Sequence, residues 1–164
     1  MAASIEPITK TFAAEVRGVD LTAGVSDADA AVIDAGMDRY AVLVLRGQDI
    51  IDDQQIAFSE LFGPLEMPGS ATNITKPEDR RLGAGLADIS NLDRDNRVLG
   101  RGDRQRMFNL GNRLWHSDSS FRAVPAKYSL LSGRAVPARG GATQFADMRR
   151  TTLAGDAPTV EQAA

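Results

Sequence analysis

The residue types that could do chemistry gather in one short stretch, Trp115-His116-Ser117-Asp118-Ser119-Ser120-Phe121. His116 is the only histidine in 164 residues, and Asp118 follows two positions later. In an extended strand the side chains alternate between faces, so this imidazole and this carboxylate would point the same way. They are two of the three ligand types in the 2-His-1-carboxylate triad that binds non-haem Fe(II). A strand histidine that is only hydrogen-bonded to a neighbour would also explain the pair.

The composition limits the classes of protein to consider. A length of 164 residues suits one domain with a sizeable core, and 43% hydrophobic with 25% charged residues argues against disorder. A net charge of -3 gives no general attraction to nucleic acid or anionic membranes. The absence of cysteine excludes disulfides, thiolate nucleophiles and cysteine-based zinc sites. No stretch resembles a signal peptide or a membrane span, so we expect a cytoplasmic protein without a membrane partner.

The first quarter of the chain predicts a strand followed by a helix. Residues 15–21 are typical of a short strand at a sheet edge that ends in a bend at Gly18. Ser26 stands where an N-cap should be and Asp29 at the third helical position, which predicts a helix over about 27–39.

The next segment predicts a second strand and a second helix. The apolar run AVLVLRG at 41–47 is typical of a central strand buried on both faces. Asp52 and Asp53 could cap a helix that Gly63-Pro64 ends. Residues 66–85 predict a long loop.

The remainder is rich in short segments of β-forming residues. A turn at Gly140-Gly141 separates the last two of them, which we expect to pair. Closely spaced strands of this kind indicate a β-rich sandwich or barrel. The predicted strands cover residues 86–93, 112–121, 126–136 and 142–148.

A cluster of arginines precedes the histidine. It could form a cationic rim that attracts an anionic substrate, or a solvated loop of exposed charges. Acidic residues are interspersed and no aromatic residue alternates with the arginines, so we do not expect nucleic-acid binding. The arginines are Arg94, Arg97, Arg101, Arg104 and Arg106, and the acids are Asp95 and Asp103.

Five ordered motifs resemble the taurine dioxygenase and 2,4-dichlorophenoxyacetate dioxygenase family, with the dichlorophenoxyacetate branch the more similar. They are LVLRGQ, QQIAFSELFGPLE, LADISNLD, NRLWHSDSSF and GGATQFADMR. The resemblance spans about residues 10–149. It implies an α+β fold in which N-terminal helices flank a partial double-stranded β-helix, or jelly-roll. It also implies Fe(II), 2-oxoglutarate as cosubstrate, O2, a helpful effect of ascorbate, and hydroxylation of a small anionic substrate such as an aryloxyalkanoate.

The resemblance also assigns roles to individual residues. It implies that His116 and Asp118 are iron ligands and that Thr143 hydrogen-bonds a 2-oxoglutarate carboxylate. Asn112 matches a position that faces substrate or cosubstrate, and Ser119 and Phe121 match positions that line the substrate pocket. A strand threonine and a core phenylalanine, however, need no ligand to explain them. Ala142 stands where the family usually has Asp.

After Arg149 the sequence departs from the family's order. The family continues with a segment that supplies the second histidine ligand and an arginine that binds 2-oxoglutarate. Residues 150–164 instead resemble the family's C-terminal strand and tail, in which Arg150 matches the second arginine of an Arg-x-x-x-Arg pattern and is expected to bind substrate. We therefore expect a single incomplete domain over 1–164, composed of an N-terminal half (1–149) and this tail. One hypothesis that explains it is an internal deletion joined at Asp147-Met148-Arg149, and the alternative is that this short tail resembles the family's end by chance.

Two functions follow from these expectations. The chain could be an Fe(II)- and 2-oxoglutarate-dependent dioxygenase whose activity is residual or restored by a partner. Alternatively, it could be a catalytically silent fragment that serves at most as an interaction module. Missing strands would leave unpaired edges, so we expect poor solubility or a homo-oligomer.

Overall fold

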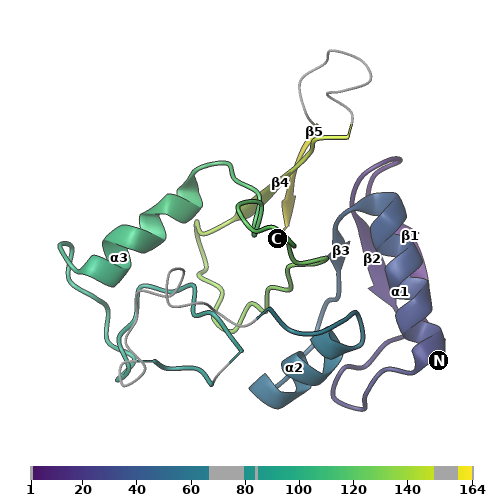
Figure 1. The fold of residues 1–164 in the computed structure, drawn as a ribbon, viewed down its shortest axis with the longest axis horizontal. Helices are drawn as coiled ribbons and strands as arrows, with labels where there is room; N and C mark the ends of the chain where they lie inside the picture. Colours follow the sequence, from purple (N-terminus) through teal and green to yellow (C-terminus); the bar gives the residue numbers. More distant parts are fainter. Residues whose placement is uncertain (1, 67–79, 84, 150–158, 164) are drawn as a thin grey trace. The chain divides into compact units, whose positions relative to one another are not determined.

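The chain forms two compact units in the computed structural model, which describes residues 2–66, 80–83, 85–149 and 159–163 (Figure 1). Unit 1 comprises Met1–Phe62 and Leu131–Ala164, and unit 2 comprises Gly63–Leu130. Most of the predicted loop at 66–85 lies outside the described residues. Within the described part, no helix is long and apolar enough to cross a membrane.

Unit 1 contains a three-stranded sheet in the order β1-β2-β3. β1 (Ser4–Pro7) pairs antiparallel with β2 (Ala14–Arg17), which pairs parallel with β3 (Leu43–Val44). The strand predicted at 15–21 therefore forms and ends at Gly18, whose φ of 77° turns the chain. The expectation that this strand lies at a sheet edge was wrong, because β2 is the middle strand of this sheet.

The strand predicted at 41–47 was also partly wrong. Only Leu43 and Val44 form a ladder, and both are half-buried rather than buried on two faces. β3 lies at the edge of the described sheet, so the apolar run has one partner strand there and not two. A long apolar run predicts that residues are buried, but the number of them that pair in a β-ladder depends on the partner strand.

Helix α1 (Asp27–Tyr40) confirms the prediction for 27–39 to within one residue. The Ser26 side chain accepts a hydrogen bond from the Asp29 N–H, as its N-cap position predicts. Figure 1 shows α1 lying along the sheet, and it contacts all three strands. A Cβ on Gly36 would lie only 3.0 Å from Ile5 Cδ1, so this glycine permits the close approach of helix and sheet.

Helix α2 (Asp52–Glu60) is followed by Gly63-Pro64, as predicted. Its N-cap is Ile51, however, and neither Asp52 nor Asp53 caps it; both lie in the first turn, where their charge favours the positive end of the helix. The Gln54 side chain accepts the Ile51 N–H at 2.9 Å instead.

The second sheet of unit 1 is a two-stranded ladder. β4 (Thr143–Asp147) confirms the strand predicted at 142–148, and Gly140 and Gly141, with φ of 74° and 72°, confirm the turn before it. Its partner was predicted wrongly. β4 pairs antiparallel with β5 (Thr159–Ala163) in the tail, from Thr143 opposite Ala163 to Asp147 opposite Thr159.

Unit 2 differs most from the sequence-based expectation. It contains helix α3 (Arg104–Asn109) and a 3₁₀ helix (Leu110–Arg113). The strands predicted at 86–93, 112–121 and 126–136 are not formed, and only the isolated bridge between Leu92 and Val98 remains of them.

The hydrophobic core lies within the first 62 residues of unit 1. Its buried apolar side chains include Phe12, Leu21, Ile33 and Phe58. No described residue of unit 2 is buried. The candidate metal ligands therefore belong to the unit that lacks a core of its own.

Candidate metal centre

The segment that carries His116 and Asp118 begins where α3 and the 3₁₀ helix end. Asp103 caps α3, because its carboxylate accepts the N–H groups of Gln105 at 2.8 Å and Arg106 at 3.3 Å. Leu114 then returns to an extended conformation, and a turn follows at residues 118–121. The strand alternation expected for His116 and Asp118 was wrong, since a turn determines where these side chains point.

The two side chains nevertheless meet. His116 Nε2 lies 3.2 Å from Asp118 Oδ1, and each side chain is about half exposed. The other ring nitrogen, Nδ1, lies 2.7 Å from the Leu114 carbonyl oxygen. A carbonyl can only accept, so Nδ1 is the donor in this contact, and Nε2 is the ring nitrogen that faces the carboxylate.

This arrangement suits a cation between the two groups. Donors at neighbouring corners of an octahedron with bonds of about 2.1 Å lie about 3.0 Å apart, close to the separation of His116 and Asp118. A metal-bound histidine typically donates its other ring N–H to a carbonyl or carboxylate, as His116 does to Leu114. A plain ion pair with a protonated ring would also fit this geometry.

The third ligand of a facial triad is not found in the described residues. No group of three histidine, cysteine, aspartate or glutamate side chains that could hold a metal occurs among them. The sequence contains no second histidine. The donor set therefore fits ferrous iron at two positions and leaves the other histidine position of the triad unfilled.

Two residues that sequence reasoning did not select support the turn after Asp118. The Ser119 hydroxyl donates to Glu66 Oε2 at 2.6 Å, and the Arg122 guanidinium pairs with the other oxygen of Glu66. Arg122 also lies over the Phe121 ring, with its Cζ 5.7 Å from the ring centroid. Glu66 ends one of the family-like motifs, but a separation of 53 positions gave no signal that it contacts this turn.

The other residues predicted from the resemblance are distributed over both units. Asn112 lies on the 3₁₀ helix of unit 2, and Phe121 is 73% exposed in the same unit. Ser119 is engaged with Glu66. Thr143 begins β4 of unit 1 and is exposed. Arg150 lies outside the described residues.

The predicted arginine cluster has the character of a solvated loop. Arg94, Arg97, Arg101 and Arg104 are exposed, and Arg97 pairs weakly with Asp95 at 3.9 Å. Arg106 instead donates to the Leu99 carbonyl at 3.0 Å and so fixes the loop to α3.

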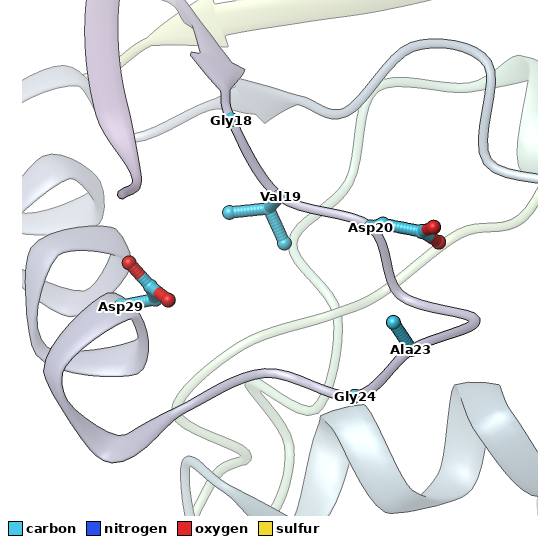
Figure 2. A pocket seen from close by; sticks show the side chains of 6 residues that line it. All are labelled: Gly18, Val19, Asp20, Ala23, Gly24 and Asp29. Carbon is cyan, nitrogen blue, oxygen red and sulfur yellow. The ribbon is translucent and has the colours of Figure 1, made fainter. Parts of the chain in front are cut away.

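A pocket of about 200 Å³ lies in unit 1, outside this centre (Figure 2). Figure 2 shows its two carboxylates on opposite sides, Asp20 on the loop and Asp29 at the start of α1. The Thr22 hydroxyl holds the pKa of Asp20 below its ordinary value, and the Ala3 N–H does the same for the pKa of Asp29. Each carboxylate thus has its own local partners, and the two do not converge on one ligand.

Comparison with known proteins supplies the family. A sequence model described as "Taurine catabolism dioxygenase TauD, TfdA family" matches residues 4–157. The alpha-ketoglutarate-dependent 2,4-dichlorophenoxyacetate dioxygenase of Cupriavidus pinatubonensis is 44% identical over 91% of this chain and 51% of its own length. The (S)-phenoxypropionate/alpha-ketoglutarate-dioxygenase of Sphingobium herbicidovorans is 37% identical over 88% of this chain and 45% of its own length.

A solved structure gives the same relationship. The crystal structure of AAD-2 in complex with Mn(II) and N-oxalylglycine matches with a TM-score of 0.88 and 47% identity. The match covers 95% of this chain and 54% of AAD-2. The chain therefore spans about half the length of the relatives it matches.

Proposed function

Because the chain belongs to the taurine catabolism dioxygenase TauD, TfdA family, we propose that His116 and Asp118 are two of the three Fe(II) ligands of a 2-oxoglutarate-dependent dioxygenase site. The observation that carries the proposal is the pairing of His116 Nε2 with Asp118 Oδ1 while Nδ1 donates to Leu114. The class of its relatives, which are alpha-ketoglutarate-dependent dioxygenases, supports it.

The residues of this chain have separate tasks in the proposed site. His116 and Asp118 bind the metal, which supplies neighbouring open positions for 2-oxoglutarate and O2 when bound. Thr143 hydrogen-bonds a carboxylate of 2-oxoglutarate. The substrate is a small anion of the aryloxyalkanoate type, in line with the relatives' substrates, and Asn112, Ser119, Phe121 and Arg150 face it.

The fold and domain proposals follow the same relationship. The ladder of β4 and β5 is part of a jelly-roll, and residues 1–164 are a single incomplete dioxygenase domain in which 150–164 take the place of the family's C-terminal strand.

A catalytically silent chain is the second candidate. It is favoured by one observation, that 164 residues contain a single histidine and therefore cannot complete a 2-His-1-carboxylate triad. In that case the chain binds metal weakly through two ligands and turns over no cosubstrate.

Metal binding and turnover test the two candidates separately. Free Mn(II) would be followed by electron paramagnetic resonance as the wild type, His116→Ala and Asp118→Asn variants are titrated. We expect each variant to bind at least about tenfold more weakly, because each removes a ligand. The control is Asp95→Asn, which removes an exposed carboxylate of the same unit and should leave affinity unchanged.

Turnover is measured as succinate released from 2-oxoglutarate with Fe(II), ascorbate and an aryloxyalkanoate. Succinate above the level of an Asp118→Ala control supports the active enzyme. Metal binding that depends on both ligands, with no succinate, supports the silent chain. Equal Mn(II) binding by all variants would overturn the proposed metal centre.

A further inference from the structure

We propose that Glu66 and Arg122 are positioning residues of the metal centre: they hold the turn at residues 118–121 in the conformation that directs the Asp118 carboxylate to His116. This inference rests on the proposed iron site. It concerns how one ligand is oriented. The two side chains act through Ser119 and through each other, not through a hydrogen bond or ion pair with His116 or Asp118.

The turn needs outside support because its backbone is unusual. Ser119, directly after Asp118, has a φ of 54°, in the left-handed region that residues with a Cβ rarely adopt. The Arg122 N–H closes the turn by donating to the Ser119 carbonyl at 3.0 Å. Glycine would adopt this conformation without strain, whereas a serine is strained there unless surrounding contacts stabilise it.

Glu66 supplies those contacts at both ends of the turn. One carboxylate oxygen accepts the Ser119 hydroxyl at 2.6 Å, and the other pairs with the Arg122 guanidinium. The side chains of Glu66 and Arg122 are each only 29% exposed, which limits screening of the ion pair by solvent. One carboxylate therefore ties the residue after Asp118 to the residue after Phe121.

The contact between Arg122 and Phe121 extends this support. The Arg122 guanidinium lies over the Phe121 ring, a cation–π arrangement that further limits the side-chain conformations of both residues. The turn is thus held by a hydrogen bond, an ion pair and a ring contact, all of which converge on Arg122 and Glu66.

The consequence for metal binding is preorganisation. Asp118 is 57% exposed, so its orientation depends on the backbone that carries it. If the turn relaxes, the carboxylate must be reordered each time a metal binds, and affinity falls. Loss of a partner that orients a metal ligand typically costs 10- to 100-fold in affinity, and for this half-exposed centre we expect the lower end, about tenfold, for Glu66→Ala.

The experiment measures Mn(II) affinity of the whole chain by electron paramagnetic resonance. Glu66→Gln is included because its amide oxygen still accepts the Ser119 hydroxyl while the charge opposite Arg122 is lost, so its affinity should lie between those of wild type and Glu66→Ala. Asp95→Asn, an exposed carboxylate in unit 2, is the matched control and should bind like the wild type. Far-UV circular dichroism checks that every variant keeps the wild-type secondary structure.

A double-variant cycle separates positioning from a general structural effect. An effect transmitted through Asp118 must disappear in the Asp118→Asn background, so Glu66→Ala should then change Mn(II) affinity less than twofold. A tenfold effect that persists without Asp118, or wild-type affinity in Glu66→Ala, would overturn the positioning role. Equal Mn(II) binding by wild type and Asp118→Asn is a different outcome, which overturns the metal centre itself.

Discussion

Asp29 is a residue whose ionisation is linked to folding. Its carboxylate accepts the Ala3 N–H at 2.7 Å and the Ser26 hydroxyl at 2.7 Å, joining the start of β1 to the start of α1. The hydrogen bond from Ala3, followed by that from Ser26, lowers the pKa of Asp29 below its ordinary value of 3.8. The folded state therefore binds a proton at this site less readily than the unfolded state.

The sign of this linkage leads to a pH-dependent prediction. The contribution of ionised Asp29 to stability is fully present above the unfolded pKa of 3.8 and is lost as pH falls through the lower folded pKa. Asp29→Asn should be less stable than wild type at neutral pH, and the difference should shrink below pH 3.8. Urea unfolding followed by circular dichroism between about pH 3 and 7 measures it.

Asp27→Asn is the control, since it removes a charge from the same helical turn. A difference between Asp29→Asn and wild type that stays constant across the acid range would contradict the linkage.

His116 and Asp118 show what sequence can predict about a site. The pair was found because imidazole and carboxylate two positions apart suggest a metal site, and their contact is present. The reason given, alternation along a strand, was wrong, because the left-handed conformation of Ser119 and the distant Glu66 determine the turn. Nothing in the sequence near Ser119 predicts its positive φ, and nothing there predicts its contact with Glu66, 53 positions earlier.

At the scale of elements, one arginine joins β4 to α1 within unit 1. The Arg149 guanidinium donates to the carbonyls of Asp38 and Arg39 at the C-terminal end of α1, where the helix carbonyls carry partial negative charge. It also pairs at 2.8 Å with Asp147, whose side chain is 3% exposed. The hydrogen bond with Asp147 raises the pKa of Arg149, so the guanidinium stays charged.

Removal of Arg149 should weaken the attachment of β4 to α1. Arg149→Gln withdraws a charge from a buried carboxylate and donors from the helix end, and we expect the free energy of unfolding to fall by about 2 kcal/mol. Urea denaturation measures it. In the double variant Asp147→Asn/Arg149→Gln the buried charge is also absent, so part of the loss should be recovered. Additive losses would contradict a direct role of the ion pair.

The elements that were predicted correctly are those specified by nearby residues. α1 begins at Asp27 because Ser26 caps it, and the turn at Gly140-Gly141 follows from glycine itself. Strands depend on distant partners, and the described part of the chain provides β4 with a partner only in β5. The β-forming residues at 112–121 form no strand, because sequence propensity alone does not form a ladder.

At the scale of the whole molecule, the two units differ in how far their apolar residues are buried. Among the described residues the buried core is confined to unit 1, whereas Leu114, Trp115, Phe121 and Val124 around the candidate ligands are 72%, 63%, 73% and 83% exposed. Exposed apolar side chains of this size favour association with another polypeptide where they come together on the surface. The chain matches about half of its relatives' length.

We therefore expect the isolated chain to self-associate through the exposed apolar side chains near His116 and Asp118. Sedimentation velocity over a range of concentrations should show a weight-average sedimentation coefficient that rises with concentration. Leu114→Gln/Val124→Gln should weaken association about tenfold, because partial burial of two such side chains contributes roughly 1–2 kcal/mol. Ile51→Gln, which changes a 61% exposed residue of unit 1, is the matched control and should associate like the wild type. A single monomeric boundary at every concentration would contradict the expectation and would mean that the exposed residues around His116 and Asp118 are accommodated within one chain.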